Sequence, residues 1–386
     1  MKRGDTRVRG ILGLTLWALA SACASSGPRS TIPEPRPHAP TDAVASLETL
    51  RIGTLNMWGV SVLGFDVADD IDARFAALTG RLAENAPGLD VMLLQEAWKD
   101  APRRRLLADP GVARTFPFRV DGQERFGGTG LVILSRLPFS ADDVAHLRFE
   151  RQGSLLHLLE GDVVSGKGVL AIRVRANDRD LWIANTHLIA CYPREHESEC
   201  DEDDPNGKYR WDQVRELRAF LARVAGDTDL IAGGDFNFTR ASRYYRTMIA
   251  PESATCLHSN PRGDVRCRGR RSDFAATLSR PLDARGWRDP GECDTERRRL
   301  DYLWQRPAPQ AGVRAAAPLR RIFDAPVVRA DGTRVQLSDH PALMGVFSLG
   351  VGGPRDRPPT AGAAVPGCPA AASAGTGWRH ATPSAP

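Results

Sequence analysis

The sequence predicts an α/β domain over residues 49–350, and three observations lead to this fold class. Short apolar runs that end in polar residues, such as 91–94 and 230–232, are typical of buried strands. Two longer segments, Asp72–Glu84 and Trp211–Val224, repeat apolar residues at helical spacing. The length that remains without the two chain ends, roughly 300 residues, suits one two-layer α/β domain with a substantial core.

Each element is predicted from its own apolar pattern. The residues that share a helix face are Phe75, Leu78 and Leu82 in the first helix and Val214, Leu217, Leu221 and Val224 in the second. Strands are predicted at residues 130–135 and 168–174. Residues 252–298 lack periodicity, and we interpret them as a long insertion with a functional role or a disulfide staple.

The first 22 residues have the organisation of a signal peptide. Basic residues at positions 2, 3, 7 and 9 precede an apolar stretch that ends at Ala22. This stretch is too short to span a bilayer, which takes about 20 apolar residues. Two alternatives stay open: cleavage after Ala22 with simple secretion, or lipid attachment at Cys23, although the Leu of a lipoprotein box stands one residue too early at Leu19. We therefore expect an exported bacterial protein, either secreted or held as a periplasmic or outer-membrane lipoprotein.

Composition separates the two chain ends from the domain. Residues 24–48, rich in Ser, Pro and Ala, predict a flexible linker. Residues 351–386, rich in Pro, Gly and Ala, predict a disordered tail. The formal net charge of +5 is small for 386 residues and gives no strong signal for nucleic-acid binding. Only four of the 52 basic residues are lysines, which a GC-rich coding bias explains, and Lys167 is one of them.

Export favours disulfides over metal ligation for the cysteines, because the compartment is oxidising. Besides Cys23 they are Cys191, Cys200, Cys256, Cys267, Cys293 and Cys368, without the paired spacing of a zinc site. Cys191 and Cys200 bracket an acidic loop, and we expect a local bridge there. Two of the three cysteines between residues 250 and 298 are expected to pair, and the sequence does not choose which.

Polar side chains with catalytic potential stand where predicted strands end. Asp235 and Asn237 follow the strand at 230–232, and the pair Asp339-His340 precedes the apolar run 343–347. Loops at strand ends can converge on one point. A carboxylate can orient water, an amide can donate to a phosphoryl oxygen, and an imidazole can move a proton or stabilise an oxyanion. Three further strand ends have the same form: Asn56, Gln95-Glu96 and Asn185-Thr186-His187.

The order of these motifs, with Leu300-Asp301-Tyr302 included, resembles the endonuclease/exonuclease/phosphatase superfamily, which has the DNase I-like fold. The resemblance covers residues 50–349. It implies a two-sheet, four-layered α/β sandwich whose site lies at one edge of the sheets. The superfamily includes nucleases, inositol-phosphate phosphatases and sphingomyelinases, so the motifs indicate the chemistry better than the substrate.

The resemblance also implies a metal site. Glu96 is expected to be the principal ligand of Mg²⁺, or of another hard divalent cation such as Mn²⁺, because such ions prefer oxygen ligands. Asn56 is expected beside Glu96 at the metal or phosphate, and Asp339 as a second acid near the metal. The alternative for Glu96 is a solvated acid at a strand end.

The remaining roles concern the phosphate and the proton. Asp235 is expected to orient or deprotonate the attacking water, while Asn237 and His187 hold phosphoryl oxygens. His340 is expected to act either as the general base or as a cation on the developing oxyanion, with its ring held by Asp301. The alternatives are a core histidine for His187 and a surface salt bridge for Asp301.

Three features resemble the neutral sphingomyelinase and sphingomyelinase C branch. They are Trp58-Gly59 after Asn56, the glycine-flanked Asp162 and Lys167 in residues 161–168, and Arg210-x-x-Gln213 after the Thr-His-Leu strand. Lys167 is expected to bring a cation to the substrate phosphate; the alternative is a β-turn with a surface lysine. A P-loop is disfavoured because no Ser or Thr follows Lys167.

We therefore expect an exported Mg²⁺-dependent phosphodiesterase that converts sphingomyelin to ceramide and phosphocholine, as a monomer with peripheral membrane contact. The sequence lacks the aromatic-tipped hairpin and the transmembrane anchors found in that branch, so either a lipid at Cys23 provides the membrane contact or the substrate is not a bilayer lipid. One alternative is an exported nuclease of the same fold, with a basic groove from the arginines at 266, 268, 270, 271, 297, 298 and 299. A remote alternative is a non-catalytic surface protein that binds lipid or a partner.

Overall fold

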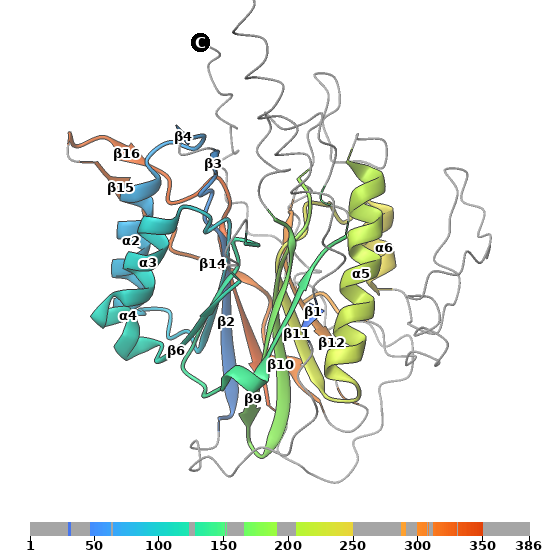
Figure 1. Cartoon of the computed structure of the whole chain (residues 1–386). Coiled ribbons are helices and arrows are strands. Elements are labelled where there is room, and N and C mark those ends of the chain that lie inside the picture. Colours follow the sequence, from blue (N-terminus) through green and yellow to red (C-terminus); the bar gives the residue numbers. More distant parts are fainter. Residues whose placement is uncertain are drawn as a thin grey trace, which may run out of the picture.

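Two β-sheets lie face to face in the computed structural model (Figure 1). It describes residues 30–31, 47–62, 65–122, 128–150, 152, 166–190, 206–249, 287–290, 299–306, 308, 312–329 and 331–349. The predicted signal peptide and tail, most of the linker and the insertion, and all seven cysteines lie outside these residues. The signal-peptide and disulfide predictions therefore stay predictions.

The first sheet, sheet A, has the strand order β1-β8-β9-β10-β11-β12. Its strands are β1 (Ser30–Thr31), β8 (Val144–Arg148), β9 (Gly168–Ala176), β10 (Arg179–His187), β11 (Asp229–Asp235) and β12 (Asp301–Arg306). Only β10 and β11 pair in parallel; the other pairs are antiparallel. Strand β1 falls inside the segment that composition predicts as a linker, and it pairs with β8 through two residues only.

The second sheet, sheet B, has the order β13-β17-β2-β5-β7-β6, and β14 also pairs with β17. Its strands are β2 (Thr49–Asn56), β5 (Val91–Gln95), β6 (Phe118–Asp121), β7 (Val132–Ser135), β13 (Arg314–Ala315), β14 (Arg320–Ile322) and β17 (Ala342–Ser348). Here β2 and β5 are the parallel pair. Two small hairpins complete the described strands: β3 (Ser61–Val62) with β4 (Phe65–Asp66), and β15 (Val327–Val328) with β16 (Arg334–Val335).

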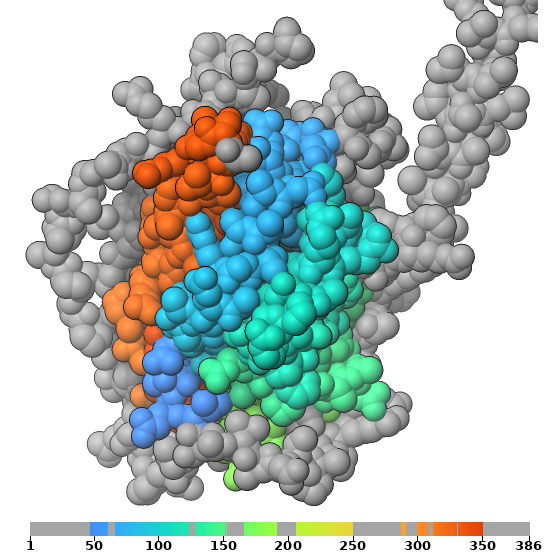
Figure 2. Space-filling model, turned by 90° about the vertical axis from the view of Figure 1, so that its left-hand side faces the viewer, coloured from blue at the N-terminus to red at the C-terminus, as the bar shows by residue number. Residues whose placement is uncertain are grey.

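Helices cover both outer faces, which makes four layers. α2 (Ile71–Glu84), α3 (Asp100–Ala108) and α4 (Pro110–Thr115) cover sheet B, while α5 (Gly207–Ala225) and α6 (Arg243–Ile249) cover sheet A (Figure 1). Figure 2 faces the first helix layer, with the blue and cyan helices beside the orange C-terminal segments. The predicted two-sheet, four-layered sandwich is confirmed. No helix among the described residues is long and apolar enough to cross a membrane.

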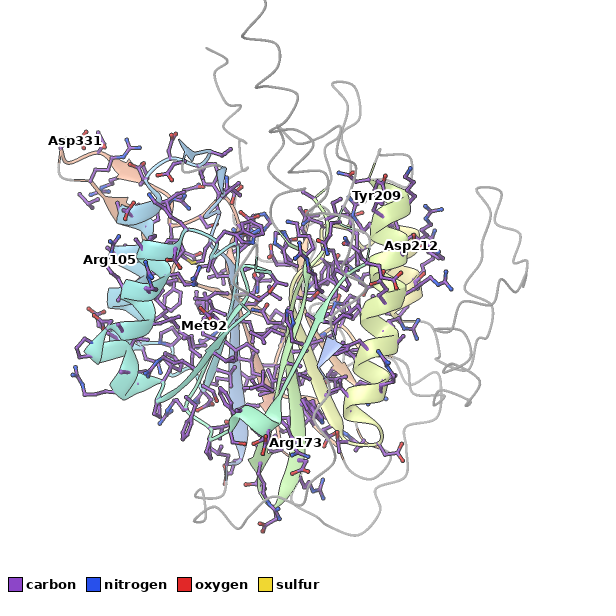
Figure 3. The ribbon with its side chains drawn as sticks, in the orientation of Figure 1. Met92, Arg105, Arg173, Tyr209, Asp212 and Asp331 are labelled. Carbon is purple, nitrogen blue, oxygen red and sulfur yellow. The ribbon has the colours of Figure 1, made fainter. Side chains whose placement is uncertain are left out.

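Three apolar clusters correspond to the three spaces between the four layers. Alternate residues of each strand face opposite sides, so Ile183 contributes to the cluster between the sheets, while Trp182 and Ala184 face α5 and α6. On the other side Met92 points from β5 toward the helices of sheet B (Figure 3), while Leu93 faces the inter-sheet cluster. This packing is why both sheets read as nearly continuous apolar runs.

The predicted elements are confirmed with small shifts of their ends. The two predicted helices are α2 and α5, and the predicted strands include β5, β7, β9, β11 and β17. The sequence pattern did not predict α3, α4 or α6. In α3 the buried residues are Pro102, Arg103 and Leu106. The aliphatic part of an arginine thus occupies a buried position, so the apolar pattern that would have predicted this helix is missing.

The two parallel pairs place four strand ends at one edge of the sandwich. In sheet B, Asn56 stands opposite Gln95 at the ends of β2 and β5. In sheet A, His187 stands opposite Asp235 at the ends of β10 and β11, and Asp235 is paired with the first residue of β12. This edge, the upper one in Figure 1, therefore gathers the predicted site residues.

Candidate active site

The floor of the site is a polar bridge between the two sheets. Gln95 on β5 donates from Nε2 to Asn185 Oδ1 on β10, over 2.7 Å, and Asn185 Nδ2 donates to the carbonyls of Leu94 and Val132. Both side chains are fully buried. These three hydrogen bonds join the two sheets and fix how they align beneath the site, while Gln95 Oε1 is buried without a partner among the described residues. The sequence marked both residues as strand ends without assigning them a role.

Glu96 follows β5 in a strained conformation, with φ of 56°. Its Oε1 accepts a hydrogen bond of 2.9 Å from Asn56 Nδ2, and its Oε2 is buried without a hydrogen-bond donor among the described residues. Burial raises the pKa of Glu96 to about 7, against the opposing charge of Lys167. A carboxylate held in this state is ready to exchange its proton for a cation.

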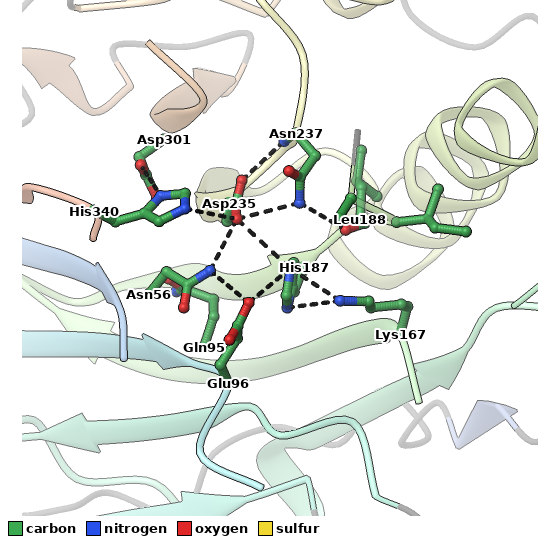
Figure 4. Close-up of polar contacts among 12 residues, drawn as sticks. Asn56, Gln95, Glu96, Lys167, His187, Leu188, Asp235, Asn237, Asp301 and His340 are labelled. Carbon is green, nitrogen blue, oxygen red and sulfur yellow. Dashed lines mark hydrogen bonds and ion pairs between the residues drawn. The ribbon is translucent and has the colours of Figure 1, made fainter. Parts of the chain in front are cut away.

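Asn56 connects the two sheets through their carboxylates (Figure 4). Its Nδ2 donates to Glu96 Oε1 and also to Asp235 Oδ2, the second over 3.0 Å. Its Oδ1 accepts from the backbone N–H of Trp58. The amide thus acts as a donor that brings the two acids together, and its predicted role as a metal ligand stays a prediction.

Asp235 lies at the centre of the cluster and is 1 % exposed. Its Oδ1 accepts from the backbone N–H of Asn237, and its Oδ2 accepts from Asn237 Nδ2 over 3.2 Å as well as from Asn56. Burial raises the pKa of Asp235 to about 6, although the nearby His340 opposes this. The preceding Gly234, with φ of 141°, is required because a Cβ there would stand 1.9 Å from the Thr186 carbonyl oxygen.

His340 and Asp301 form a pair beside Asp235. His340 Nδ1 lies 2.7 Å from Asp301 Oδ2, and His340 Nε2 lies 3.8 Å from Asp235 Oδ2. Burial opposes the charged ring, but the carboxylates of Asp301, Asp235 and Asp339 together raise the pKa of His340 well above its ordinary value. The neighbouring carboxylates therefore favour the charged form of the ring, and Nε2 lies on its Asp235 side.

His187 and Lys167 form the opposite wall. Lys167 Nζ, fully buried, lies 3.1 Å from His187 Nε2 and 3.3 Å from Nδ1. His187 Nε2 is also 3.5 Å from Asp235 Oδ2 and 3.7 Å from Glu96 Oε1. Burial, followed by the charges of Lys167 and His340, lowers the pKa of His187 well below its ordinary value, so the ring is neutral.

Lys167 reaches this position because β9 and β10 pair antiparallel. Gly168, the first residue of β9, stands opposite His187, the last residue of β10. The alternative of a surface lysine is therefore wrong. Residues 153–165, which include Asp162, lie outside the described residues, so the predicted Asp-Lys pair is described for its lysine only.

Nine site residues were predicted from the sequence. Eight of them contact at least one other predicted site residue in the structure, and the exception is Asp339. Asp339 is exposed, accepts from Ser338 Oγ, and influences Glu96 and His340 through its charge. Its predicted place near the metal stays a prediction.

Sequence reasoning missed Trp98, whose ring lies 4.8 Å from Lys167 Nζ and 5.6 Å from the His187 ring. Its position two residues after Glu96 was the available signal.

The donor set fits a hard divalent cation. Ligand atoms of Glu96, His187 and Asp235 lie within 4.8 Å of one another, as do those of Asp235, Asp301 and His340. In the first group two of the three ligand atoms are carboxylate oxygens, whereas in the second the charged form of His340 has no free lone pair for a metal. Glu96 Oε2 is a buried acceptor without a donor among the described residues. The arrangement is therefore a possible metal site made of acids and imidazole.

Residues 53–340 match the Endonuclease/Exonuclease/phosphatase family. A putative neutral sphingomyelinase of Drosophila melanogaster is 26% identical over 204 residues, which are 52% of this chain and 42% of that protein. Sphingomyelinase C of Leptospira interrogans is 26% identical over 178 residues, which are 42% of this chain and 29% of that protein. The chain thus spans less than half the length of either relative.

The crystal structure of sphingomyelinase C from Streptomyces griseocarneus is similar in fold. It is 20% identical and aligns with a TM-score of 0.50 over 77% of this chain and 99% of that chain. At this identity the likeness concerns the fold alone. The family match, in contrast, spans most of the chain and includes every residue of the site described above. This chain belongs to the Endonuclease/Exonuclease/phosphatase family.

Proposed function

We propose that this protein is an exported Mg²⁺-dependent phosphodiesterase that hydrolyses a sphingomyelin-type phospholipid to ceramide and phosphocholine. The observation that carries this proposal is the buried ammonium of Lys167 beside His187, within the cluster of Glu96 and Asp235. A compact cation enclosed in a site of acids, an amide and an imidazole suits the anionic phosphodiester group of such a lipid. Two relatives named as sphingomyelinases support the substrate class.

Each side chain has a role in this reaction. Glu96 and Asp235 would hold the Mg²⁺ ion, which supplies positive charge to the phosphoryl oxygens when bound. Lys167, His187 and Asn237 orient the phosphate, and Asp235 orients the attacking water. His340 is charged through its carboxylate neighbours, which favours it as a cation on the developing oxyanion and as the donor of a proton to the leaving alkoxide.

Export and membrane contact belong to the same proposal. A signal peptide over residues 1–22 would deliver the enzyme to the cell surface or beyond, and a lipid on Cys23 would hold it at the membrane where its substrate lies. We propose that the enzyme acts as a monomer. Cell fractionation of the parent protein and Cys23→Ser distinguishes the two forms: a lipoprotein leaves the membrane fraction on substitution, and a secreted protein is unaffected.

The decisive assay compares substrates. Purified protein is incubated with sphingomyelin vesicles or supercoiled plasmid DNA, with Mg²⁺ or with EDTA, and released phosphocholine and DNA nicking are measured. Phosphocholine release that requires Mg²⁺ and is lost in Glu96→Gln supports the proposal. Nicking of DNA without phosphocholine release would contradict it and leave the nuclease alternative, whose predicted basic groove lies mostly outside the described residues.

A further inference from the structure

A buried arginine on helix α2 holds the chain directly behind Asn56. The Arg74 side chain reaches from the outer helix layer, is 1 % exposed, and donates to the carbonyls of Met57 over 2.7 Å and Trp58 over 2.8 Å. A third hydrogen bond, from Nε, reaches the carbonyl of Asp69 over 2.9 Å. The guanidinium also lies 4.8 Å from the centre of the Trp58 ring.

The segment that Arg74 holds touches two site residues. The Trp58 N–H donates to Asn56 Oδ1 over 2.8 Å, which leaves the Asn56 Nδ2 group to contact both carboxylates. Gly59 packs so closely that a Cβ there would stand 2.2 Å from the Glu96 carbonyl oxygen. Both Trp58 and Glu96 have positive φ, so their conformations need support from surrounding contacts.

A second buried arginine has the same relation to sheet A. Arg210 on α5 is fully buried and donates to the carbonyls of Ile189 over 3.2 Å and Ala190 over 3.0 Å, directly behind β10 and His187. The neighbouring Leu188 connects to the site through its backbone. Its N–H donates to the Asp235 carbonyl, and its own carbonyl accepts from Asn237 Nδ2, each over 3.0 Å.

We propose that Arg74 and Arg210 are positioning residues for the hydrolytic reaction, each fixing from its helix layer the backbone segment behind a site strand. Burying a guanidinium is costly, and an apolar side chain of similar volume would fill the same space at lower cost. The planar fork, however, holds two carbonyls in one relative orientation, which neither an apolar side chain nor lysine reproduces. The inference rests on the proposed function, since hydrolysis is its main readout.

Arg306 supplies a matched control. It is 1 % exposed and donates to the carbonyl of Gly226 over 2.7 Å, so it has the same burial and the same kind of contact. It ends β12, whose first residue, Asp301, lies at the site, so Arg306 stands at the opposite end of the sandwich. Replacing it removes a buried carbonyl contact without touching the segments behind the site.

The experiment measures kcat, KM and thermal stability for the lysine and methionine variants of all three arginines. The kinetic assays are run well below the melting temperature of each variant. We expect the change in stability for each type of variant to be comparable at all three positions. For Arg74→Lys and Arg210→Lys, kcat should fall by about 10- to 100-fold with KM changed by less than about twofold, because a small misplacement of site groups has this effect. The methionine variants should lose more, and Arg306→Lys should keep the parental kcat.

A parental kcat in folded Arg74→Lys or Arg210→Lys would overturn the inference, and so would an equal loss in Arg306→Lys. Titration with Mn²⁺, monitored by electron paramagnetic resonance, distinguishes failure of the positioning role from failure of the proposed function. If the parent hydrolyses neither substrate, Arg74→Lys should still bind Mn²⁺ about 10-fold more weakly than Arg306→Lys. Equal affinities would then refute the positioning role.

Discussion

Replacing Glu96 by glutamine should make the metal-free protein more stable at alkaline pH. Burial raises the pKa of this carboxyl from its ordinary 4.5 to about 7, so the folded protein holds the proton more tightly than the unfolded chain does. The side chain therefore costs nothing below pH 4.5, where both states are protonated. Stability is lost as pH rises toward 7, and above pH 7 the full cost is present.

The size of the effect follows from the same two values. The difference between 4.5 and about 7 corresponds to on the order of 3 kcal/mol. Glutamine is neutral at every pH and keeps an oxygen at Oε1 to accept from Asn56 Nδ2. We therefore expect metal-free Glu96→Gln to be more stable than the parent by about 1–3 kcal/mol at pH 8 and by much less at pH 5.

Urea denaturation in EDTA at the two pH values measures this difference directly. Glu84→Gln is the matched control, since Glu84 is exposed at the end of α2 and its replacement should change stability little at either pH. The reasoning is refuted if Glu96→Gln is no more stable than the parent at pH 8. A gain of the same size at pH 5 would also refute it, because the effect would then not come from the charge.

Four other predictions concern the site. Glu96→Gln and His340→Ala should each lower hydrolysis by about 10²–10⁴, and more than a tenth of the parental rate in either would contradict the site. Asp301→Asn should lower the pKa of His340, because it removes the carboxylate 2.7 Å from Nδ1; NMR titration of the ring tests this, and an unchanged pKa would disprove it. Lys167→Ala should slow sphingomyelin cleavage and Lys167→Arg should restore it only in part, since a planar fork does not replace a compact ammonium; a parental rate in Lys167→Ala would withdraw the lipid substrate. Mg²⁺ should raise the melting temperature more at pH 8 than at pH 5.5, because Glu96 and Asp235, with pKa values of about 7 and about 6, must lose their protons to bind it; an equal rise at both pH values, measured by calorimetry, would place the ion elsewhere.

The local sequence determined the two long helices, the central strands and the residues that end them, but not α3, α4 or α6. Helices α2 and α5 follow from apolar residues at helical spacing, and β5 and β11 from short apolar runs, because these patterns state which faces are buried. Asn56, Glu96, His187 and Asp235 stand just where such runs stop. The chemistry of the site could therefore be predicted from the residue types at strand ends, and the family resemblance suggested the role of each residue.

Only the tertiary structure decided how these groups face one another. The pairing of β9 with β10 turns a lysine of ambiguous context into a buried cation 3.1 Å from His187. The Gln95–Asn185 bridge likewise joins residues that are 90 positions apart. The raised pKa of Glu96 depends on burial, which the whole fold supplies. A local pattern specifies which side of a strand is apolar, whereas distances, burial and charge environment arise from segments far apart in the chain, so they become determined only when the two sheets close on each other.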